Sequence, residues 1–205
     1  RERFMSPDVD AIRAYLTAIT NPWRELGAAQ HLELRCLAEG SQTNVSLFST
    51  DMLSKAIDHA AAMNEAGLNV YTCVNLINPT MLSPGKAAKD ADILQAHFAF
   101  ADCDTPGSAE ALQRNAPPYD FCVITGSQPY LRCHYYWQLV EPVHDLLDWS
   151  ETQKALAKAY AADEKVCNPS RIMRVAGTIA YPSIKKREKG YVPELTQLTG
   201  LKPCQ

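Results

Sequence analysis

HFAFADCD, residues 97–104, is an apolar run that ends in two aspartates and predicts a β-strand. Successive side chains of a strand point to opposite faces, so Asp102 and Asp104 project together while Cys103 points the other way, into the core. Two carboxylates on one face can bind a pair of divalent ions. An isolated Asp-x-Asp is more often a solvated turn or a helix cap, so the metal-binding interpretation depends on residues further along the chain.

A histidine and an arginine stand on another predicted strand. LRCHYYW, residues 131–137, places Arg132 and His134 two residues apart and therefore on one face. A lone histidine in an apolar strand is more often a hydrogen-bonded core residue. Here the neighbouring cation and the preceding turn TGSQP favour a phosphate-facing role, in which His134 donates a hydrogen bond to a triphosphate oxygen.

A third carboxylate and two further arginines stand in DEKVCNPSRIMR, residues 163–174. Taken alone, Asp163 would be a surface acid at the end of a helix, and Arg171 and Arg174 would be a salt-bridging pair. Arginine, however, binds phosphate in a bidentate manner and always keeps its charge. Acids, a histidine and arginines in this order predict a metal-dependent nucleotidyl-transfer site.

Length and charge limit the class of protein. The chain has 205 residues, of which 46% are hydrophobic, and a formal net charge of -3. It can bury a sizeable core in one domain or in two closely packed halves. The modest acidity argues against a uniformly basic sleeve for nucleic acid, so any polynucleotide groove must be local. The basic run IKKREKG, residues 184–190, is interpreted as a solvated surface loop.

The seven cysteines are scattered and include no Cys-x-x-Cys pair, which argues against a zinc site or a disulfide framework. They are interpreted as small buried hydrophobes in a reducing compartment, which predicts a cytoplasmic protein. The sequence has no run of 18 apolar residues, so no membrane partner is expected. The start at Arg1, without an initiator methionine, leads us to expect that the chain is part of a longer one.

The periodicity of apolar residues and the turn signals predict one α+β unit whose two halves share a cleft. Ser6 is the expected cap of the first helix and Ser150 that of the last. Helices are expected near residues 7–19, from Ser49 or Thr50 to Gly67, and at 108–115 and 150–161. Strands are expected at 31–37, 44–49, 68–77, 97–104, 120–126, 133–140 and, as the last, 171–176.

The segments ADCD (101–104), TGSQPYLRCHYYW (125–137) and AADEKVCNPSRIMRVAGT (161–178) occur in the order of three known motifs. In this order the sequence resembles the archaeo-eukaryotic primase superfamily, in particular the RepB-like primase-polymerase domains of plasmid and phage replication proteins. The resemblance runs from about His31 to Lys186. It implies an N-terminal α/β module packed on an antiparallel sheet like that of an RNA-recognition motif, with the active site in the cleft between them.

The same resemblance implies the roles of individual residues. Asp102, Asp104 and Asp163 would be catalytic and would hold two Mg²⁺ or Mn²⁺ ions. His134 would bind the nucleoside triphosphate together with basic neighbours, which we take to be Arg132, Arg171 and Arg174. The activity would be synthesis of primers or extension of DNA or RNA on a single-stranded DNA template, in plasmid, phage or mobile-element replication. The partners would be that template and NTPs or dNTPs, with room for a helicase domain or protein.

The sequence departs from the family pattern at four places. Arg132 stands where the second motif often has serine, and Asn168 stands where the third motif often has a second acid. The family's Pro-Gly-Thr turn is Ala176-Gly177-Thr178. Pro182 occupies the position of the usual lysine, for which Lys185 or Lys186 could substitute.

We therefore expect residues 1–205 to be a single primase-polymerase catalytic domain, with an N-terminal half at 1–80 and a second half at 81–205. Tyr71 or Asn75 is a candidate for a residue near the ribose. Two other functions are compatible with parts of the pattern. A metal-dependent nuclease would also use clustered acids, and a non-catalytic nucleic-acid-binding module would share the sheet, although paired aspartates would repel phosphate.

Overall fold

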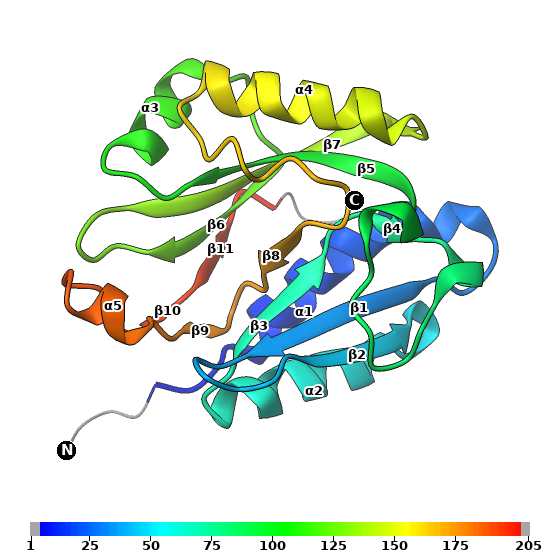
Figure 1. Ribbon diagram of the computed structural model, residues 1–205, viewed down its shortest axis with the longest axis horizontal. Coiled ribbons are helices and arrows are strands. Elements are labelled where there is room, and N and C mark those ends of the chain that lie inside the picture. The colour runs from blue at the N-terminus through cyan, green and yellow to red at the C-terminus, as the bar shows by residue number, and fades with distance from the viewer. Residues whose placement is uncertain (1–4, 202–205) are drawn as a thin grey trace.

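Two antiparallel sheets form the framework of the structure, a computed structural model that describes residues 5–201 (Figure 1). The first sheet has the strand order β2-β1-β3-β8 and the second has the order β11-β6-β7-β5-β4. The first consists of β1 (His31–Leu37), β2 (Asn44–Ser49), β3 (Asn69–Cys73) and β8 (Ile172–Arg174). The second consists of β4 (Leu76–Ile77), β5 (Ile93–Cys103), β6 (Phe121–Gly126), β7 (Arg132–Val143) and β11 (Gln197–Thr199). A small pair, β9 (Ile179–Ala180) and β10 (Glu194–Leu195), completes the strands of the described residues.

Helices pack against both sheets. Figure 1 shows α2 against the first sheet and α3 and α4 above the second, with α1 behind the strands. The helices are α1 (Val9–Thr20), α2 (Leu53–Glu65), α3 (Ser108–Asn115), α4 (Leu146–Ala159) and α5 (Ile184–Arg187). Short stretches of 3-10 helix lie at η1 (Asn21–Leu26), η2 (Thr50–Met52), η3 (Pro79–Met81) and η4 (Asp90–Asp92). The predicted α+β fold, with an N-terminal α/β module against an antiparallel sheet, is confirmed.

The main core joins the two sheets through α1. Ile12, Leu16 and Ile19 of this helix are buried together with residues of β1, β5 and β6. The Tyr15 hydroxyl lies 3.0 Å from that of Tyr136 in the second sheet, and the two rings meet edge to face. Because the two sheets share this core, they are held in a fixed position relative to each other, and the residues that line the space between them are well supported.

The helix caps differ from the expected ones. Asp8, not Ser6, caps α1, since its carboxylate accepts a hydrogen bond from the Ala11 N–H at 3.0 Å. Asp145, not Ser150, caps α4 by accepting from two N–H groups of the first turn. Ser150 lies inside α4 and donates to the Leu146 carbonyl. Ser and Asp are both good N-caps, so their local sequence alone did not decide between them.

The prediction of a single strand at 68–77 is also wrong, because this segment divides into β3 of the first sheet and β4 of the second. The turn at Val74 and Asn75 thus carries the chain from one sheet to the other. Residues 171–176 are not the last strand either, since β8 is followed by β9, β10 and β11. The basic run at 184–190 is not simply a loop, because its first four residues form α5, capped by Ser183.

The chain crosses between the sheets in both directions. β4 precedes residue 80 but pairs with β5, whereas β8 comes after residue 80 but pairs with β3.

No helix among residues 5–201 is long and apolar enough to cross a membrane. The six cysteines in this range are free, and five of them are buried as expected; Cys204 lies outside the described residues.

Gly177 allows a close approach between the loop after β8 and the start of α1. Its φ is +79°, and a Cβ there would lie 2.4 Å from the Asp8 carbonyl oxygen and 2.7 Å from the Ile12 nitrogen. The Asp8 N–H donates to the Gly177 carbonyl at 2.8 Å. Only glycine fits this contact, which joins the loop after β8 to the start of α1.

We predict that Gly177→Ala lowers the free energy of unfolding by about 2–4 kcal/mol, because it combines left-handed backbone strain with overpacking. Gly85→Ala is the matched control: its φ is +75° and its Cβ would meet nothing within 4 Å. The control should cost about 1 kcal/mol through backbone strain alone. Urea unfolding curves measure both values, and equal losses would contradict the packing role of Gly177.

Candidate active site

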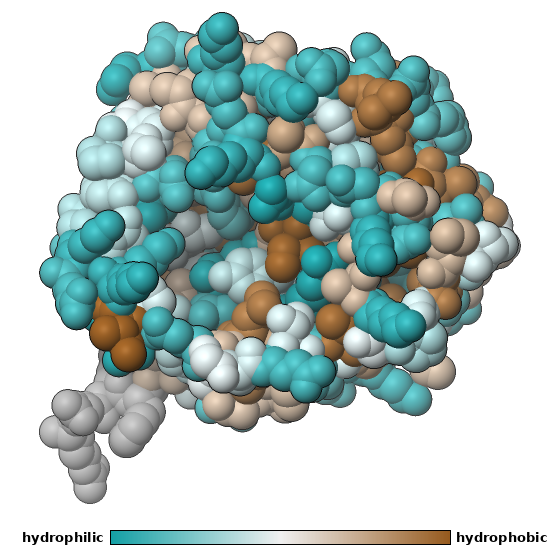
Figure 2. Space-filling model, viewed as in Figure 1, coloured by the Kyte–Doolittle hydropathy of each residue, from teal (hydrophilic) through white to brown (hydrophobic). Residues whose placement is uncertain are grey.

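A cavity of about 310 Å³ opens between the two sheets. Figure 2 shows a hollow in this face of the molecule with hydrophilic residues around it. The residues that line the cavity come from both sheets and from the segment after β8. They are Asn69, Tyr71, Asp102, Asp104, Thr125, Arg132, His134, Arg174, Ala180, Tyr181, Pro182, Ser183, Lys186, Tyr191 and Val192.

The register of β5 and β7 places an aspartate beside a histidine. Asp102 is paired across the strands with His134, and Cys103 with Cys133. Both cysteines point away from the cavity into a core beneath α3, as the alternation of side chains requires. Asp102 and Asp104 therefore face the cavity together, which agrees with the geometry expected from the sequence.

His134 is buried and uncharged. Burial and the positive charge of Arg174 lower the pKa of its imidazole to about 3. Its Nε2 lies 3.5 Å from an oxygen of Asp102, and because the ring is neutral this contact is not an ion pair at neutral pH. The buried Nδ1 has no hydrogen-bond partner among the described residues. One polar atom of the ring is thus left without a hydrogen-bond partner within residues 5–201.

Asp163, in the segment between α4 and β8, is attached to the backbone of Asp102. Its N–H donates to the Asp102 carbonyl at 2.8 Å. Burial and the charge of Asp163 raise the pKa of Asp102 to about 6, from an ordinary value of 3.8. Burial and the charges of Asp102 and Asp163 also raise the pKa of Asp104. The charges of the three predicted acids thus act on one another, and we refer to Asp102, Asp104 and Asp163 as the carboxylate cluster.

The carboxylate cluster has the chemistry that a hard divalent cation needs. Its three acids supply oxygen donors that repel one another, and a bound cation would relieve this repulsion. Among residues 5–201, however, no three His, Cys, Asp or Glu side chains are already grouped as a metal-binding set. Asp102 and Asp104 line the cavity, whereas Asp163 is not part of the lining.

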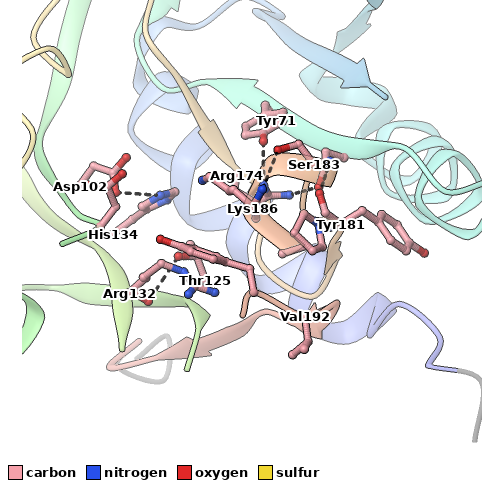
Figure 3. A pocket seen from close by; sticks show the side chains of 15 residues that line it. Tyr71, Asp102, Thr125, Arg132, His134, Arg174, Tyr181, Ser183, Lys186 and Val192 are labelled. Atoms are coloured by element: carbon pink, nitrogen blue, oxygen red, sulfur yellow. Dashed lines mark hydrogen bonds and ion pairs between the residues drawn. The ribbon is translucent and has the colours of Figure 1, made fainter. Parts of the chain in front are cut away.

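Of the predicted phosphate-binding arginines, Arg174 and Arg132 line the cavity and Arg171 does not. Arg174 lines the cavity, where its guanidinium donates to the Tyr71 hydroxyl at 2.7 Å and to the Asn69 side chain. Figure 3 shows Arg174 across the cavity from Asp102 and His134. Arg171 does not line the cavity. Its guanidinium donates to the Lys165 carbonyl, and its charge lowers the pKa of Asp102.

Arg132 lines the cavity but already has a partner of opposite charge. Its guanidinium lies 3.0 Å from the Glu194 carboxylate and 4.4 Å from the centre of the Tyr191 ring. Glu194 also accepts from the N–H and the hydroxyl of Ser127. Gly126 leaves the space for this pair, since a Cβ there would overlap the arginine. The pairing joins β10 to the loop between β6 and β7.

Lys186 was not among the predicted site residues, although the sequence singled it out as a possible substitute for the family lysine. It lines the cavity from α5 and has no ion-pair partner within residues 5–201. Its charge opposes the rise in the pKa of both Asp102 and Asp104. Its position inside a basic run was the signal, but periodicity could not show which lysine points inward.

The two candidates for a residue near the ribose separate clearly. Tyr71 lines the cavity. Asn75 is buried, and its side chain donates to the Pro169 carbonyl at 2.9 Å. Asn75 therefore holds a loop and does not face the cavity.

The chain matches no protein-family model and no curated protein. In structure it is similar to the AEP domain of the primase-polymerase (PrimPol) of cyanophage S-2L, with a TM-score of 0.63 and 22% identity over 96% of this chain and 93% of that chain. It is also similar to the primase RepB', with a TM-score of 0.62 and 13% identity over 95% of this chain and 57% of that chain. A third similar structure is the catalytic domain of RepB' in complex with initiator DNA, with a TM-score of 0.58 and 15% identity over 95% of this chain and 86% of that chain. At these identities the likeness concerns the fold.

The raised pKa of Asp102 predicts a pH-dependent cost to stability in the presence of a chelator. The unfolded chain loses this proton near pH 3.8 and the folded chain near pH 6, so ionisation of Asp102 removes stability as the pH rises through that window. His134 has the opposite slope: the unfolded chain takes up a proton below about pH 6.5, whereas the folded imidazole stays neutral down to about pH 3.

The variant Asp102→Asn should isolate the contribution of Asp102 to the pH dependence of stability. The free energy of unfolding of the variant, relative to the unchanged protein, should rise by on the order of 1–3 kcal/mol between about pH 4 and about pH 7. Denaturant unfolding at several pH values measures this difference, with Asp58→Asn on the exposed face of α2 as the control. A difference that stays flat over this range would contradict the clustering of the carboxylates.

Proposed function

Since the chain has the fold of an archaeo-eukaryotic primase-type domain, we propose that its cavity is the active site of a metal-dependent nucleotidyltransferase. The reaction would be synthesis or extension of a polynucleotide on a single-stranded DNA template. The observation that carries this proposal is the arrangement of charge: carboxylates lie at one side of the cavity, with Lys186 and Arg174 at the other. A nucleoside triphosphate with bound cations needs both.

In this proposal Asp102, Asp104 and Asp163 hold Mg²⁺ or Mn²⁺ in a two-metal site. Bound ions would supply Lewis acidity, which neutralises the triphosphate and lowers the pKa of the attacking 3′-hydroxyl. The protein would contribute mainly position and electrostatic stabilisation. The repulsion within the carboxylate cluster supports a cation there, because it is the feature that a cation would relieve.

Five side chains would bind the triphosphate, shape the wall beside it or act on the site through their charge. His134 would face the triphosphate from the wall that it shares with Asp102, and Lys186 and Arg174 would supply charge from the opposite wall. Arg132 would act with much of its charge balanced by Glu194, so its main contribution would be to shape the wall. Arg171 would act from outside the cavity through its field on the carboxylates.

The nucleic-acid partner is proposed from the fold. One of the similar structures is the RepB' catalytic domain in complex with initiator DNA, which supports DNA as a partner of this chain; the single-stranded template stays a prediction. A helicase partner, and a role in the replication of a plasmid, phage or mobile element, stay predictions.

The test is synthesis on a single-stranded template with labelled nucleotides and Mg²⁺ or Mn²⁺, with and without a primer. Products should depend on the metal and should disappear in the Asp102→Ala/Asp104→Ala double variant, which should still fold because both side chains face the cavity and not the core. Retained synthesis in the double variant would refute the proposal. Template degradation without nucleotide would instead indicate a nuclease, and binding without turnover would indicate a nucleic-acid-binding module.

Lys186→Ala should lower kcat/KM for the incoming nucleotide by about 10- to 100-fold, the usual cost of losing a hydrogen bond between charged groups. Lys185→Ala is the matched control, because Lys185 lies next to it on α5 and is exposed but does not line the cavity. Steady-state kinetics of primer extension distinguish the two. Equal effects would show that α5 acts only through its net charge.

A further inference from the structure

The segment that carries Asp163 and Arg171 has no helix or strand of its own. Residues 160–171, between α4 and β8, form a series of turns. At one end, the Asp163 N–H is bound to the Asp102 carbonyl. Within the segment, the Val166 N–H donates to the Asp163 carbonyl at 3.0 Å, and the Arg171 guanidinium donates to the Lys165 carbonyl. The course of the segment from Asp163 to Arg171 is therefore fixed by these bonds and by what holds its far end.

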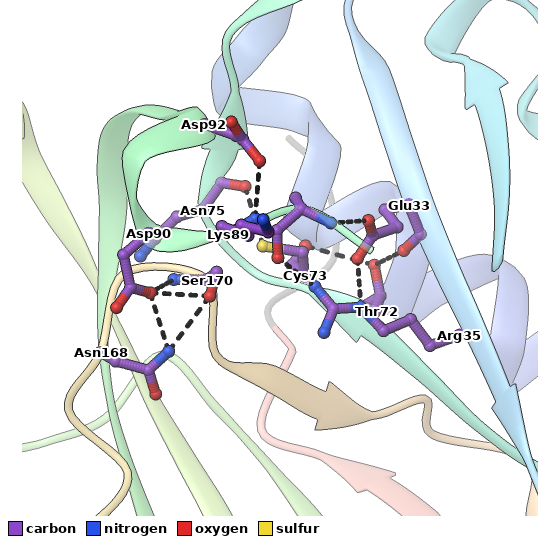
Figure 4. Close-up of polar contacts among 11 residues, drawn as sticks. Glu33, Arg35, Thr72, Cys73, Asn75, Lys89, Asp90, Asp92, Asn168 and Ser170 are labelled. Carbon is purple, nitrogen blue, oxygen red and sulfur yellow. Dashed lines mark hydrogen bonds and ion pairs between the residues drawn. The ribbon is translucent and has the colours of Figure 1, made fainter. Parts of the chain in front are cut away.

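Asp90 holds that far end. One of its carboxylate oxygens accepts three hydrogen bonds: from the Ser170 N–H at 2.9 Å, from the Ser170 hydroxyl at 2.7 Å and from the Asn168 side chain at 2.9 Å (Figure 4). Burial acts to raise the pKa of Asp90, but these hydrogen bonds and the charge of Arg171 outweigh it and leave the pKa below its ordinary value. From the other side, Asn75 binds the carbonyl of Pro169. The turn at 168–170 is thus held at two points.

Asp90 is itself fixed to the first sheet. It lies in the loop between β4 and β5, where the Ala88 N–H donates to Glu33 at 2.7 Å and Arg35 donates to the Ala88 carbonyl at 2.9 Å. Glu33 is 1% exposed, and it pairs with Arg35. Figure 4 shows these contacts together, from β1 through the loop that carries Asp90 to Asn168 and Ser170. A rigid support is therefore available to the segment that carries Asp163.

We propose that Asp90 is a positioning residue: its carboxylate clamps the turn at Asn168 and Ser170 and thereby sets where Asp163 stands beside Asp102. The proposal rests on the proposed function for its effect on synthesis. The clamp itself does not depend on the proposed function, because its contacts can be followed by hydrogen exchange and by measurements of metal binding. Asp90 lies outside the cavity lining and would touch neither substrate nor metal.

The test compares Asp90→Ala, Asp90→Asn and a control. Asp92→Ala is the matched control, because Asp92 belongs to the same turn of 3-10 helix and accepts from the Lys89 N–H, but makes no hydrogen bond to residues 160–171. Three quantities are measured: hydrogen exchange of the Ser170 amide, binding of Mn²⁺ to the protein alone by electron paramagnetic resonance, and kcat and KM for primer extension.

Asp90→Ala should speed exchange of the Ser170 amide and weaken Mn²⁺ binding by about 10- to 100-fold, the usual effect of removing a residue that orients a metal ligand. It should lower kcat by a similar factor with little change in the KM for nucleotide. Asp90→Asn keeps an acceptor oxygen and should restore most of each property. Asp92→Ala should resemble the unchanged protein.

Two results would overturn the clamp. One is exchange and Mn²⁺ binding in Asp90→Ala that match those of Asp92→Ala. The other is an Asp90→Asn variant as impaired as Asp90→Ala, since this would assign the effect to charge. If Asp90→Ala fails to fold, Ser170→Ala takes its place: it removes one hydrogen bond and should give a smaller loss of the same kind, whereas no loss would refute the proposal. Absence of synthesis by the unchanged protein would refute the proposed function, while exchange would still test the clamp.

Discussion

The pairing of β5 with β7 is the constraint on which the rest of the site depends. It puts Asp102 opposite His134 and turns Cys103 and Cys133 to the other face. A shift of one residue in this register would exchange the two faces, burying the acid in an apolar core and exposing the cysteines to the cavity. The apolar face beneath α3 and the core around Tyr136 therefore fix the chemistry of the cavity as well as the fold.

The energetics of the cavity oppose those of the core. Asp102 is held near two other carboxylates, and burial adds to the cost of its charge. The neutral His134 does not compensate that charge, while Lys186 and Arg174 oppose the rise in pKa from a distance. The cost of holding charges in this way is offset by packing elsewhere, and such groups are typical of sites that bind charged ligands. The main core, which α1 shares with both sheets, provides that packing.

The sequence predicted those parts of the site that depend on local periodicity. Asp102, Asp104 and His134 lie on or next to strands, where alternation alone decides the face, and all three line the cavity. It did not predict the partner of Arg132, because Glu194 lies 62 positions later in β10 and no local pattern links the two residues. It also joined β3 and β4 into one strand, since both are apolar and no local signal marks the point where the chain changes sheets.

The balanced charge of Arg132 explains why the segment after β8 matters to the cavity. We expected Arg132 to bind phosphate although the family pattern often has serine there, but the structure gives its guanidinium a carboxylate and an aromatic ring as neighbours. Among residues 5–201, the cavity-lining cations without a carboxylate partner are Arg174 of β8 and Lys186 of α5. The same segment contributes Glu194, which neutralises one cation, and Lys186, which adds another. Arg132, which we expected to bind phosphate, and Lys186, the candidate substitute lysine, thus both line the cavity; the first is paired with Glu194, and the second has no ion-pair partner among residues 5–201.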